Sequence, residues 1–281
     1  MWSGVYVCCY PSKLWVIKAM TAIVRTLTRE GFVLAADGRN SEAIGGAVIS
    51  DSVQKLFPIK TLIGSFAYSI AGTINVITDD GTEVAVNLID EVRKSAESLA
   101  TQKTKNLVGY AVRLCRPVCR ALEDARKLGR FSRYPSYQPS VPSERGNTIM
   151  RLCIDGFREG YPSSVAIRLF HENDRLCEPE IMTETNYVGL HRALAPVRLI
   201  GSILWEAEGD PRLAAYKGPQ ILPKDITLQD AIDRSRSYIQ AHSDPEAIAI
   251  DDDCRSVGGH IHIATITPSE GFRWIIEPVC E

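Results

Sequence analysis

Two short β-branched, apolar segments separated by a four-residue turn constrain the first ordered part of this chain most strongly. They read TAIVRTL (21–27) and FVLAAD (32–37), and the turn between them ends in Gly31, a residue that tolerates positive φ. This pattern predicts an antiparallel β-hairpin. A turn centred two residues before Gly31 places Thr21 opposite Asp37 at the open end, so a hydroxyl would lie near a carboxylate.

A single lysine interrupts the next apolar segment. DSVQKLFPI (51–59) alternates around Lys55, and IGSFAYSIAG (63–72) follows as a further predicted strand that ends at Gly72. A lysine in such a strand either keeps its ammonium group in water at the surface or is held inward and paired with a carboxylate. The residues alone leave both interpretations open.

The rest of the chain predicts a helical middle and late strands. Helical periodicity is present at about 82–101 and 105–127, and a third helix at 227–244 opens with a T-x-x-D pattern typical of a capping box. Residues 260–278 read as a closing hairpin. Early strands, central helices and late strands together predict the α+β class.

The first part of the chain also carries a recognisable pattern. T-x-I-V, G-F-V-L-A-A-D-G-R, Q-K-L-F-P-I and A-G, in this order, resemble the start of a proteasome β-type subunit and of bacterial proteasome-like N-terminal-nucleophile (Ntn) hydrolases. With Thr21 counted as the first residue, Gly31 and Asp37 fall at the family's eleventh and seventeenth positions. Lys55 lies about two residues beyond the family position, because of an insertion in the loop 40–46.

The resemblance continues near the C-terminus. Ser202 follows a glycine after a predicted strand, and Asp253 and Ser256 keep the D-x-x-S spacing, although Val257 is an extra residue before the glycine pair. The resemblance implies a four-layer αββα sandwich of two antiparallel sheets. It places one domain at 21–281.

The resemblance implies a site as well as a fold. Thr21 would be the nucleophile with its own α-amine as base, and Lys55, kept charged by Asp37, would lower the pKa of that amine. The backbone N–H of Gly72 would be the oxyanion donor. The remaining implied residues are Ser202, Asp253 and Ser256, which would orient the amine and a water, and Val53 and Ile70, which would line an apolar substrate pocket. No metal or cofactor is implied.

This chemistry requires Thr21 to be the first residue. Residues 1–20 are therefore interpreted as a propeptide or a mis-called N-terminal extension, with an ordinary N-terminal strand or arm as the third possibility. Met20 precedes Thr21, which suits removal of an initiator methionine better than the Gly-Thr cleavage usual in the family. A persisting segment would block the amine.

The function implied is a threonine-type peptidase that hydrolyses peptide bonds within a homo-oligomeric ring, with an ATP-dependent unfoldase as a further partner that the resemblance suggests. One alternative is an Ntn amidase that acts on a small amide. The other is a catalytically silent scaffold that forms rings.

Composition excludes other classes. A net charge of −2 argues against a general nucleic-acid binder, and no run of about 18 uncharged apolar residues is present to span a membrane. The eight cysteines contain no repeated C-x-x-C pair and are interpreted as reduced thiols, which predicts a cytoplasmic protein. The basic segment 126–146 contains aromatic residues, but we interpret it as a mobile insertion rather than a single-strand nucleic-acid tract.

Two further motifs have weak support. Ser52 and Lys55 form an S-x-x-K match, but the other β-lactamase motifs are absent. His260 and His262 alternate on one strand and could begin a zinc site, but no third ligand has a helpful spacing.

Overall fold

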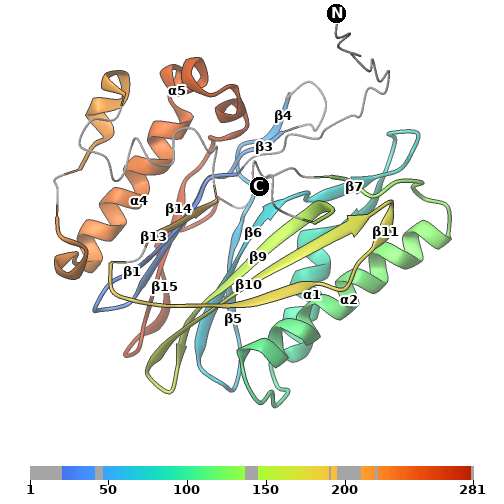
Figure 1. Cartoon of the computed structure of the whole chain (residues 1–281), viewed down its shortest axis with the longest axis horizontal. Coiled ribbons are helices and arrows are strands. Elements are labelled where there is room, and N and C mark those ends of the chain that lie inside the picture. Colours follow the sequence, from blue (N-terminus) through green and yellow to red (C-terminus); the bar gives the residue numbers. More distant parts are fainter. Residues whose placement is uncertain are drawn as a thin grey trace, which may run out of the picture.

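A computed structural model describes residues 21–41, 47–136, 145–189, 191–194, 210–218 and 221–279. Two antiparallel sheets dominate it, with helices beside them (Figure 1). The five-stranded sheet has the order β13 (His191–Leu194), β1 (Ile23–Leu27), β2 (Phe32–Ala36), β14 (His262–Thr267) and β15 (Gly271–Ile276). The six-stranded sheet has the path β11 (Arg175–Leu176), β10 (Tyr161–Glu172), β9 (Asn147–Arg158), β6 (Ser65–Gly72) and β5 (Leu56–Ile59), and β12 (Glu180–Glu184) also pairs with β10.

The predicted first hairpin is confirmed as β1 and β2. Its register pairs Ile23 with Ala36, and a two-residue turn is closed by the backbone N–H of Thr28 donating to Gly31. Asp37 therefore lies opposite Ala22, with which it exchanges backbone and side-chain hydrogen bonds, and not opposite Thr21 as predicted. The expected register was one residue off because the turn is the shorter of the two that the spacing allows.

Gly31 is needed for a different reason from the one predicted. Its φ is not positive. A Cβ at this position would lie 2.4 Å from the backbone oxygen of Ile266 in β14. Close approach of the neighbouring strand, and not turn conformation, therefore excludes a side chain here.

Two small sheets and the helices complete the described fold. The two-stranded sheets are β3 (Asn40–Ser41) with β4 (Val48–Ser50), and β7 (Asn75–Ile77) with β8 (Val84–Asn87). The α-helices are α1 (Leu88–Leu99), α2 (Leu107–Lys127), α4 (Leu228–Ser243) and α5 (Pro245–Ile250). Short 3-10 helices are η1 (Pro211–Tyr216), η2 (Pro223–Asp225) and η3 (Asp252–Ser256).

The predicted helices are present with adjusted starts. α1 begins six residues later than the predicted 82, because the residues before it form β8 and Asn87 caps the helix by accepting from the N–H of Asp90. α4 has the predicted capping box, in which Thr227 and Asp230 each accept from the other's backbone N–H. The closing hairpin is β14 and β15.

Three apolar clusters show which faces are buried. One joins the six-stranded sheet to α1 and α2, and another joins the five-stranded sheet to α4. A third contains side chains from both sheets, such as Ile23 and Leu34 with Leu56 and Ala67. The α+β class with antiparallel sheets is confirmed.

A buried ion cluster also connects the two sheets. Arg25 of β1 donates from Nη1 to Asp155 of β9 at 3.1 Å and to Glu184 of β12 at 2.8 Å. Ser164 of β10 donates to the same Asp155 carboxylate at 2.7 Å. Asp155 is fully buried and Arg25 is 5% exposed, so this cation cannot exchange its partners for water.

The described ends of the segment 126–146 contribute to the core. Phe131 and Tyr134 are buried, and the guanidinium of Arg126 lies over the Tyr134 ring while it pairs with Asp174. These two aromatic rings are therefore not available to stack on bases. None of the helices in the described ranges combines the length and the apolar character that a bilayer span needs.

Candidate active site

Lys55 lies at the centre of a buried polar cluster. Its Nζ donates to the hydroxyl of Thr21 at 3.2 Å, to Oδ1 of Asp37 at 2.9 Å and to the backbone carbonyl of Arg39 at 2.7 Å. Three acceptors match the three protons of an ammonium group. Lys55, Asp37 and Thr21 are 1%, 0% and 4% exposed. The lysine is therefore held inward, the second of the two interpretations that the sequence left open.

Asp37 is held in place by its neighbours as well as by the lysine. Its Oδ1 accepts from the N–H of Ala22 at 2.9 Å, and its Oδ2 accepts from the N–H of Gly258 at 3.1 Å. The end of β2, the start of β1 and the loop after η3 thus converge on one carboxylate. This convergence fixes the direction in which Asp37 presents its oxygens to Lys55.

Burial and pairing oppose each other in this cluster. Burial raises the pKa of Asp37 and lowers the pKa of Lys55, while the charge of each partner counteracts the other's shift. Removal of either partner would leave an uncompensated charge in a site without water contact. The two groups therefore depend on each other for their ionised forms.

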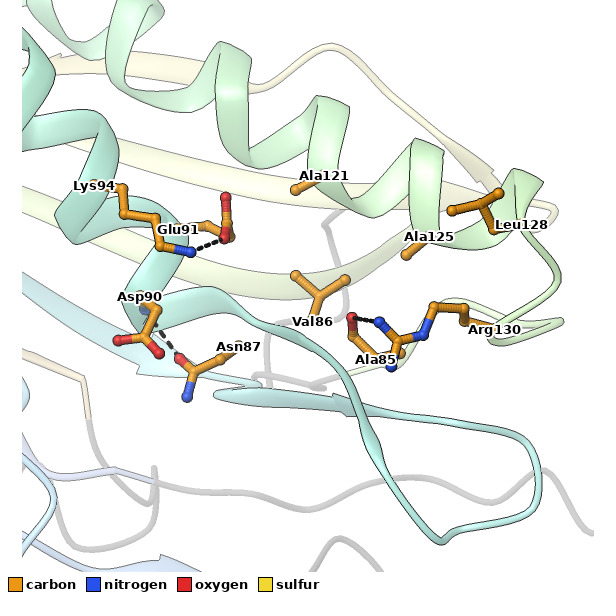
Figure 2. A pocket seen from close by; sticks show the side chains of 10 residues that line it. All are labelled: Ala85, Val86, Asn87, Asp90, Glu91, Lys94, Ala121, Ala125, Leu128 and Arg130. Atoms are coloured by element: carbon orange, nitrogen blue, oxygen red, sulfur yellow. Dashed lines mark hydrogen bonds and ion pairs between the residues drawn. The ribbon is translucent and has the colours of Figure 1, made fainter.

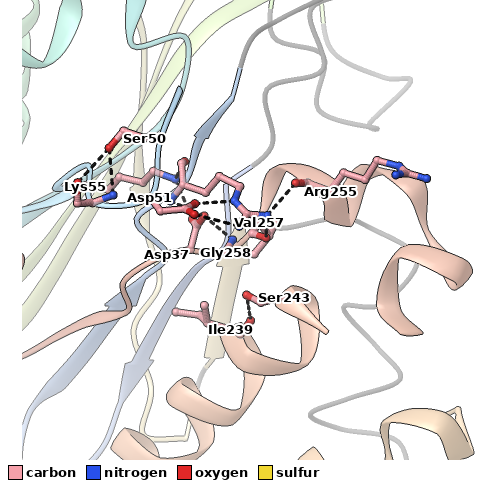
Figure 3. A network of polar contacts seen from close by, with 11 residues as sticks. Asp37, Ser50, Asp51, Lys55, Ile239, Ser243, Arg255, Val257 and Gly258 are labelled. Carbon is pink, nitrogen blue, oxygen red and sulfur yellow. Dashed lines mark hydrogen bonds and ion pairs between the residues drawn. The ribbon is translucent and has the colours of Figure 1, made fainter. Parts of the chain in front are cut away.

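Arg39 clamps the loop around Gly258 against the site. Figure 3 shows Val257 and Gly258 of this loop beside Asp37. The Arg39 guanidinium pairs with Asp51 at 2.7 Å and donates to the carbonyls of Arg255 and Val257 at 3.3 Å. The carbonyl of Gly258 in turn accepts from the N–H of Gly38 and of Arg39. A Cβ on Gly258 would lie 2.7 Å from the Arg39 guanidinium carbon, so the clamp requires glycine there.

The remaining predicted orienting residues are only partly described. Asp253 and Ser256 both lie on η3, and the Ser256 hydroxyl donates to the backbone oxygen of Asp253 at 2.7 Å. η3 leads directly into the Gly258 loop, and the N–H of Gly258 donates to Asp37. This loop therefore connects Asp253 and Ser256 to the cluster. Ser202 and residues 1–20 lie outside the described residues.

The predicted substrate-contacting residues lie on two segments. The N–H of Val53 donates to the carbonyl of Gly38 at 2.8 Å, which places Val53 beside the end of β2. Ile70 packs in the core between the six-stranded sheet and its helices. Gly72 ends β6 with a φ of 105°. The roles of all three stay predictions.

The structure places the weaker motifs elsewhere. Ser52 lies against Ser50, at 3.0 Å between the hydroxyls, whereas the Lys55 ammonium donates to the three acceptors named above. Nε2 of His262 accepts from the backbone N–H of Lys55 at 3.0 Å. Within the described ranges, no group of three or more His, Cys, Asp and Glu residues is placed to hold a metal ion.

Sequence reasoning missed His262 as a neighbour of the site. The alternation of His260 and His262 drew attention to this strand, but only the pairing of β14 with β2 brings it next to Asp37. No spacing in the sequence predicts a contact between His262 and Lys55, because 207 residues separate them.

A pocket of about 300 Å³ lies away from this cluster, between β8 and the helices α1 and α2 (Figure 2). Its lining includes apolar residues such as Val86 and Ala125 and the charged Glu91, Lys94 and Arg130. None of the predicted site residues that the structure describes lines it. The pocket is therefore a separate feature of the helical face.

Comparison with known proteins was made at three levels. No family model matches the chain, and no curated protein matches it. Among solved structures, it is similar to Anbu (ancestral beta-subunit) from Yersinia bercovieri, with 13% identity, a TM-score of 0.49, and coverage of 92% of this chain and 88% of that one. It is also similar to Anbu from Hyphomicrobium sp. strain MC1, with 14% identity, a TM-score of 0.48, and coverage of 91% and 88%. An Anbu (Gly-1) mutant from the same strain is also similar, with 15% identity, a TM-score of 0.46, and coverage of 91% of this chain and 87% of that one.

These findings correct the family expected from the motifs. The assignment to the proteasome β-type subunits and their bacterial proteasome-like relatives is wrong, because no family model matches the chain. The motifs were misleading because they are short.

Proposed function

We propose that this protein is a hydrolase whose nucleophile is the hydroxyl of Thr21, and that it cleaves peptide bonds. The observation that carries the proposal is the buried ammonium of Lys55, which donates to Thr21 Oγ1 at 3.2 Å and to Asp37 at 2.9 Å. A cation aimed at a hydroxyl stabilises the alkoxide character that the oxygen acquires during attack. A surface lysine would supply little of this effect, because water screens it.

The proposed chemistry needs a base for the hydroxyl proton. In a chain that starts at Thr21, the α-amine has an ordinary pKa of about 7.7–8.0 and lies on the same residue as the hydroxyl. The hydroxyl oxygen attacks the carbonyl carbon as its proton moves to the amine. The C–N bond then breaks, and the leaving amine takes that proton. Water hydrolyses the resulting ester, which restores Thr21 and releases the acid.

The other predicted residues extend the same proposal. Gly72 would stabilise the oxyanion through its N–H, and Val53 and Ile70 would line the substrate pocket. The residues proposed to orient the amine and the water are Ser202, Asp253 and Ser256.

The proposal also covers the larger organisation of the protein. We infer that residues 21–281 form one four-layer αββα domain, supported by the apolar clusters on both faces of each sheet. We also propose assembly into a homo-oligomeric ring and an ATP-dependent unfoldase partner, and a cytoplasmic location that rests on the interpretation of the eight cysteines as reduced thiols.

The first experiment determines the N-terminus of the full chain after expression, by intact mass and terminal sequencing. Release of residues 1–20 would give Thr21 as the first residue. That protein is then assayed on a panel of peptides and a panel of small amides, beside Thr21→Ala and the matched control Thr21→Ser, which keeps a hydroxyl. We expect peptide hydrolysis by the wild type and the serine variant only.

Other results would redirect the proposal. Turnover of small amides alone would favour the amidase alternative. A chain that keeps residues 1–20 and hydrolyses neither panel would favour the silent scaffold. Full activity of Thr21→Ala would refute the threonine nucleophile.

A further inference from the structure

The main chain of Lys55 is held by both sheets. Its carbonyl accepts from the N–H of Ile70 in β6 at 3.0 Å. Its N–H donates to Nε2 of His262 in β14 at 3.0 Å. The pairing of β5 with β6 starts only at Leu56, so the Lys55 N–H has no partner in that ladder. The imidazole therefore satisfies a buried donor that strand pairing leaves over.

His262 is itself firmly placed. It is the first residue of β14, pairs with Ala36 of β2 and is 1% exposed. Its ring meets Trp274 edge-to-face at 6.3 Å, and the backbone of His260 also hydrogen-bonds the ring. Burial, aided by the charge of Lys55, lowers the pKa of His262 to about 3, so the ring is neutral. In a neutral ring whose Nε2 accepts, Nδ1 carries the proton.

The His262 ring links the Lys55 main chain to β14, the strand beside β2. β14 lies beside β2, and β2 ends one residue before Asp37. A hydrogen bond from Lys55 to β14 therefore fixes the lysine main chain relative to the strand that carries its carboxylate partner. The titratable groups that act on the His262 ring are Lys55 and His260, and the charged groups that act on the Lys55 ammonium are Asp37 and Arg39.

We propose that His262 is a positioning residue, which sets the Lys55 main chain so that its ammonium reaches Thr21 and Asp37 together. The proposal rests on the proposed function, because positioning has a catalytic consequence only if Thr21 reacts. His262 accepts from the Lys55 backbone N–H, so we infer that it acts through Lys55 and not on the substrate. An error of about 1 Å in the position of a catalytic group can cost about 100-fold in rate.

Two variants separate hydrogen bonding from packing. His262→Leu fills a similar volume but offers no acceptor, whereas His262→Gln keeps an acceptor on a side chain of similar reach. His242→Leu is the matched control, since His242 is another fully buried histidine, on α4 and outside the proposed site. Each variant is made in the full chain, its N-terminus is determined, and kcat, KM and the thermal midpoint are measured.

We expect His262→Leu to lower kcat by about 100-fold with little change in KM. His262→Gln should restore kcat to within about tenfold of wild type, as expected if the acceptor sets the geometry. His242→Leu should lower the thermal midpoint without lowering kcat of the folded protein. Equal loss of kcat in both His262 variants, or no loss in His262→Leu, would overturn the proposal.

A second readout does not depend on turnover. Crystal structures of the His262 variants give the distance from Lys55 Nζ to Thr21 Oγ1. Displacement of the ammonium in His262→Leu, with the wild-type distance kept in His262→Gln, supports positioning even if the wild type hydrolyses nothing. That combination would reject the proposed function and keep the inference, whereas an unmoved ammonium in His262→Leu rejects the inference itself.

Discussion

Two buried cations connect the sheets, and their surroundings differ. Arg25 is bound by the carboxylates of Asp155 and Glu184, whereas Lys55 is bound by one carboxylate, one carbonyl and the hydroxyl of Thr21. Burial acts to lower the pKa of Arg25, but its two carboxylates raise that pKa well above its ordinary value. The pKa of Lys55 is instead lowered by burial.

The difference predicts a structural role for the Arg25 cation and a catalytic role for the Lys55 cation. The Arg25 guanidinium stays charged under all ordinary conditions. Both of its charged acceptors are carboxylates, so we expect this cluster only to hold strands together. The pKa of a buried ammonium group shifts with its surroundings. The Lys55 ammonium also lies against the Thr21 hydroxyl, which is the proposed nucleophile. We therefore expect changes at Lys55 to affect rate and changes at Arg25 to affect stability.

The largest effect is expected for Lys55→Met. Loss of the cation removes the stabilisation of the developing alkoxide, so kcat should fall by about 1,000-fold. The unpaired Asp37 should also lower the free energy of unfolding by about 3 kcal/mol. Rates per folded molecule and urea unfolding measure the two effects. A Lys55→Met protein with wild-type kcat would refute the expected difference in role between the Lys55 and Arg25 clusters.

Arg25→Met should show the reverse pattern. It leaves the fully buried Asp155 without its cation, and the free energy of unfolding should fall by about 3–5 kcal/mol while kcat of the folded protein stays within a few-fold of wild type. The double variant Arg25→Met/Asp155→Leu should recover most of the loss, because both buried charges are gone. A kcat loss as large as that of Lys55→Met would show that the Arg25 cluster also shapes the site.

The parts of the fold that follow from local pattern were predicted well. β1 and β2 follow from β-branched alternation, and α4 follows from helical periodicity and its Thr227 cap, because these signals act within a few residues. α1 was placed too early, since Val84–Asn87 pair with a strand that the local pattern does not indicate. The reason for Gly31 was missed because it depends on a strand more than 200 residues later.

The candidate site was predictable only where chemistry restricts the choices. The residues left open whether Lys55 is exposed or paired with a carboxylate, and only the family resemblance implied Asp37 as the partner; the structure pairs them. The catalytic roles of these residues stay predictions. His262 and the clamp from Arg39 to the Gly258 loop depend on tertiary packing alone, which no local spacing encodes.

The pH dependence of stability provides a smaller effect that sharpens the comparison. The pKa of His262 is about 3 in the folded chain and ordinarily about 6.5, so the unfolded chain binds a proton between these values that the folded chain does not. The free energy of unfolding should therefore fall as pH falls through this window. From pH 7 to 4.5, the histidine should account for about 2–3 kcal/mol.

His262→Gln removes this contribution. Chemical unfolding of both proteins at the two pH values gives the difference directly. The same slope in wild type and variant would mean that other groups, and not His262, dominate acid sensitivity near Lys55.

The smallest effect is expected at the exposed edge of the site. Asp51 pairs with Arg39 at 2.7 Å, but Asp51 is half exposed, so water and salt screen the pair. Asp51→Asn should lower the free energy of unfolding by less than about 1 kcal/mol, and the loss should shrink further at high salt. Arg39 retains its bonds to the carbonyls of Arg255 and Val257, so the Gly258 loop and its N–H to Asp37 should remain in place. If Asp51→Asn instead lowers kcat as much as His262→Leu, the clamp and not the imidazole controls the position of Lys55.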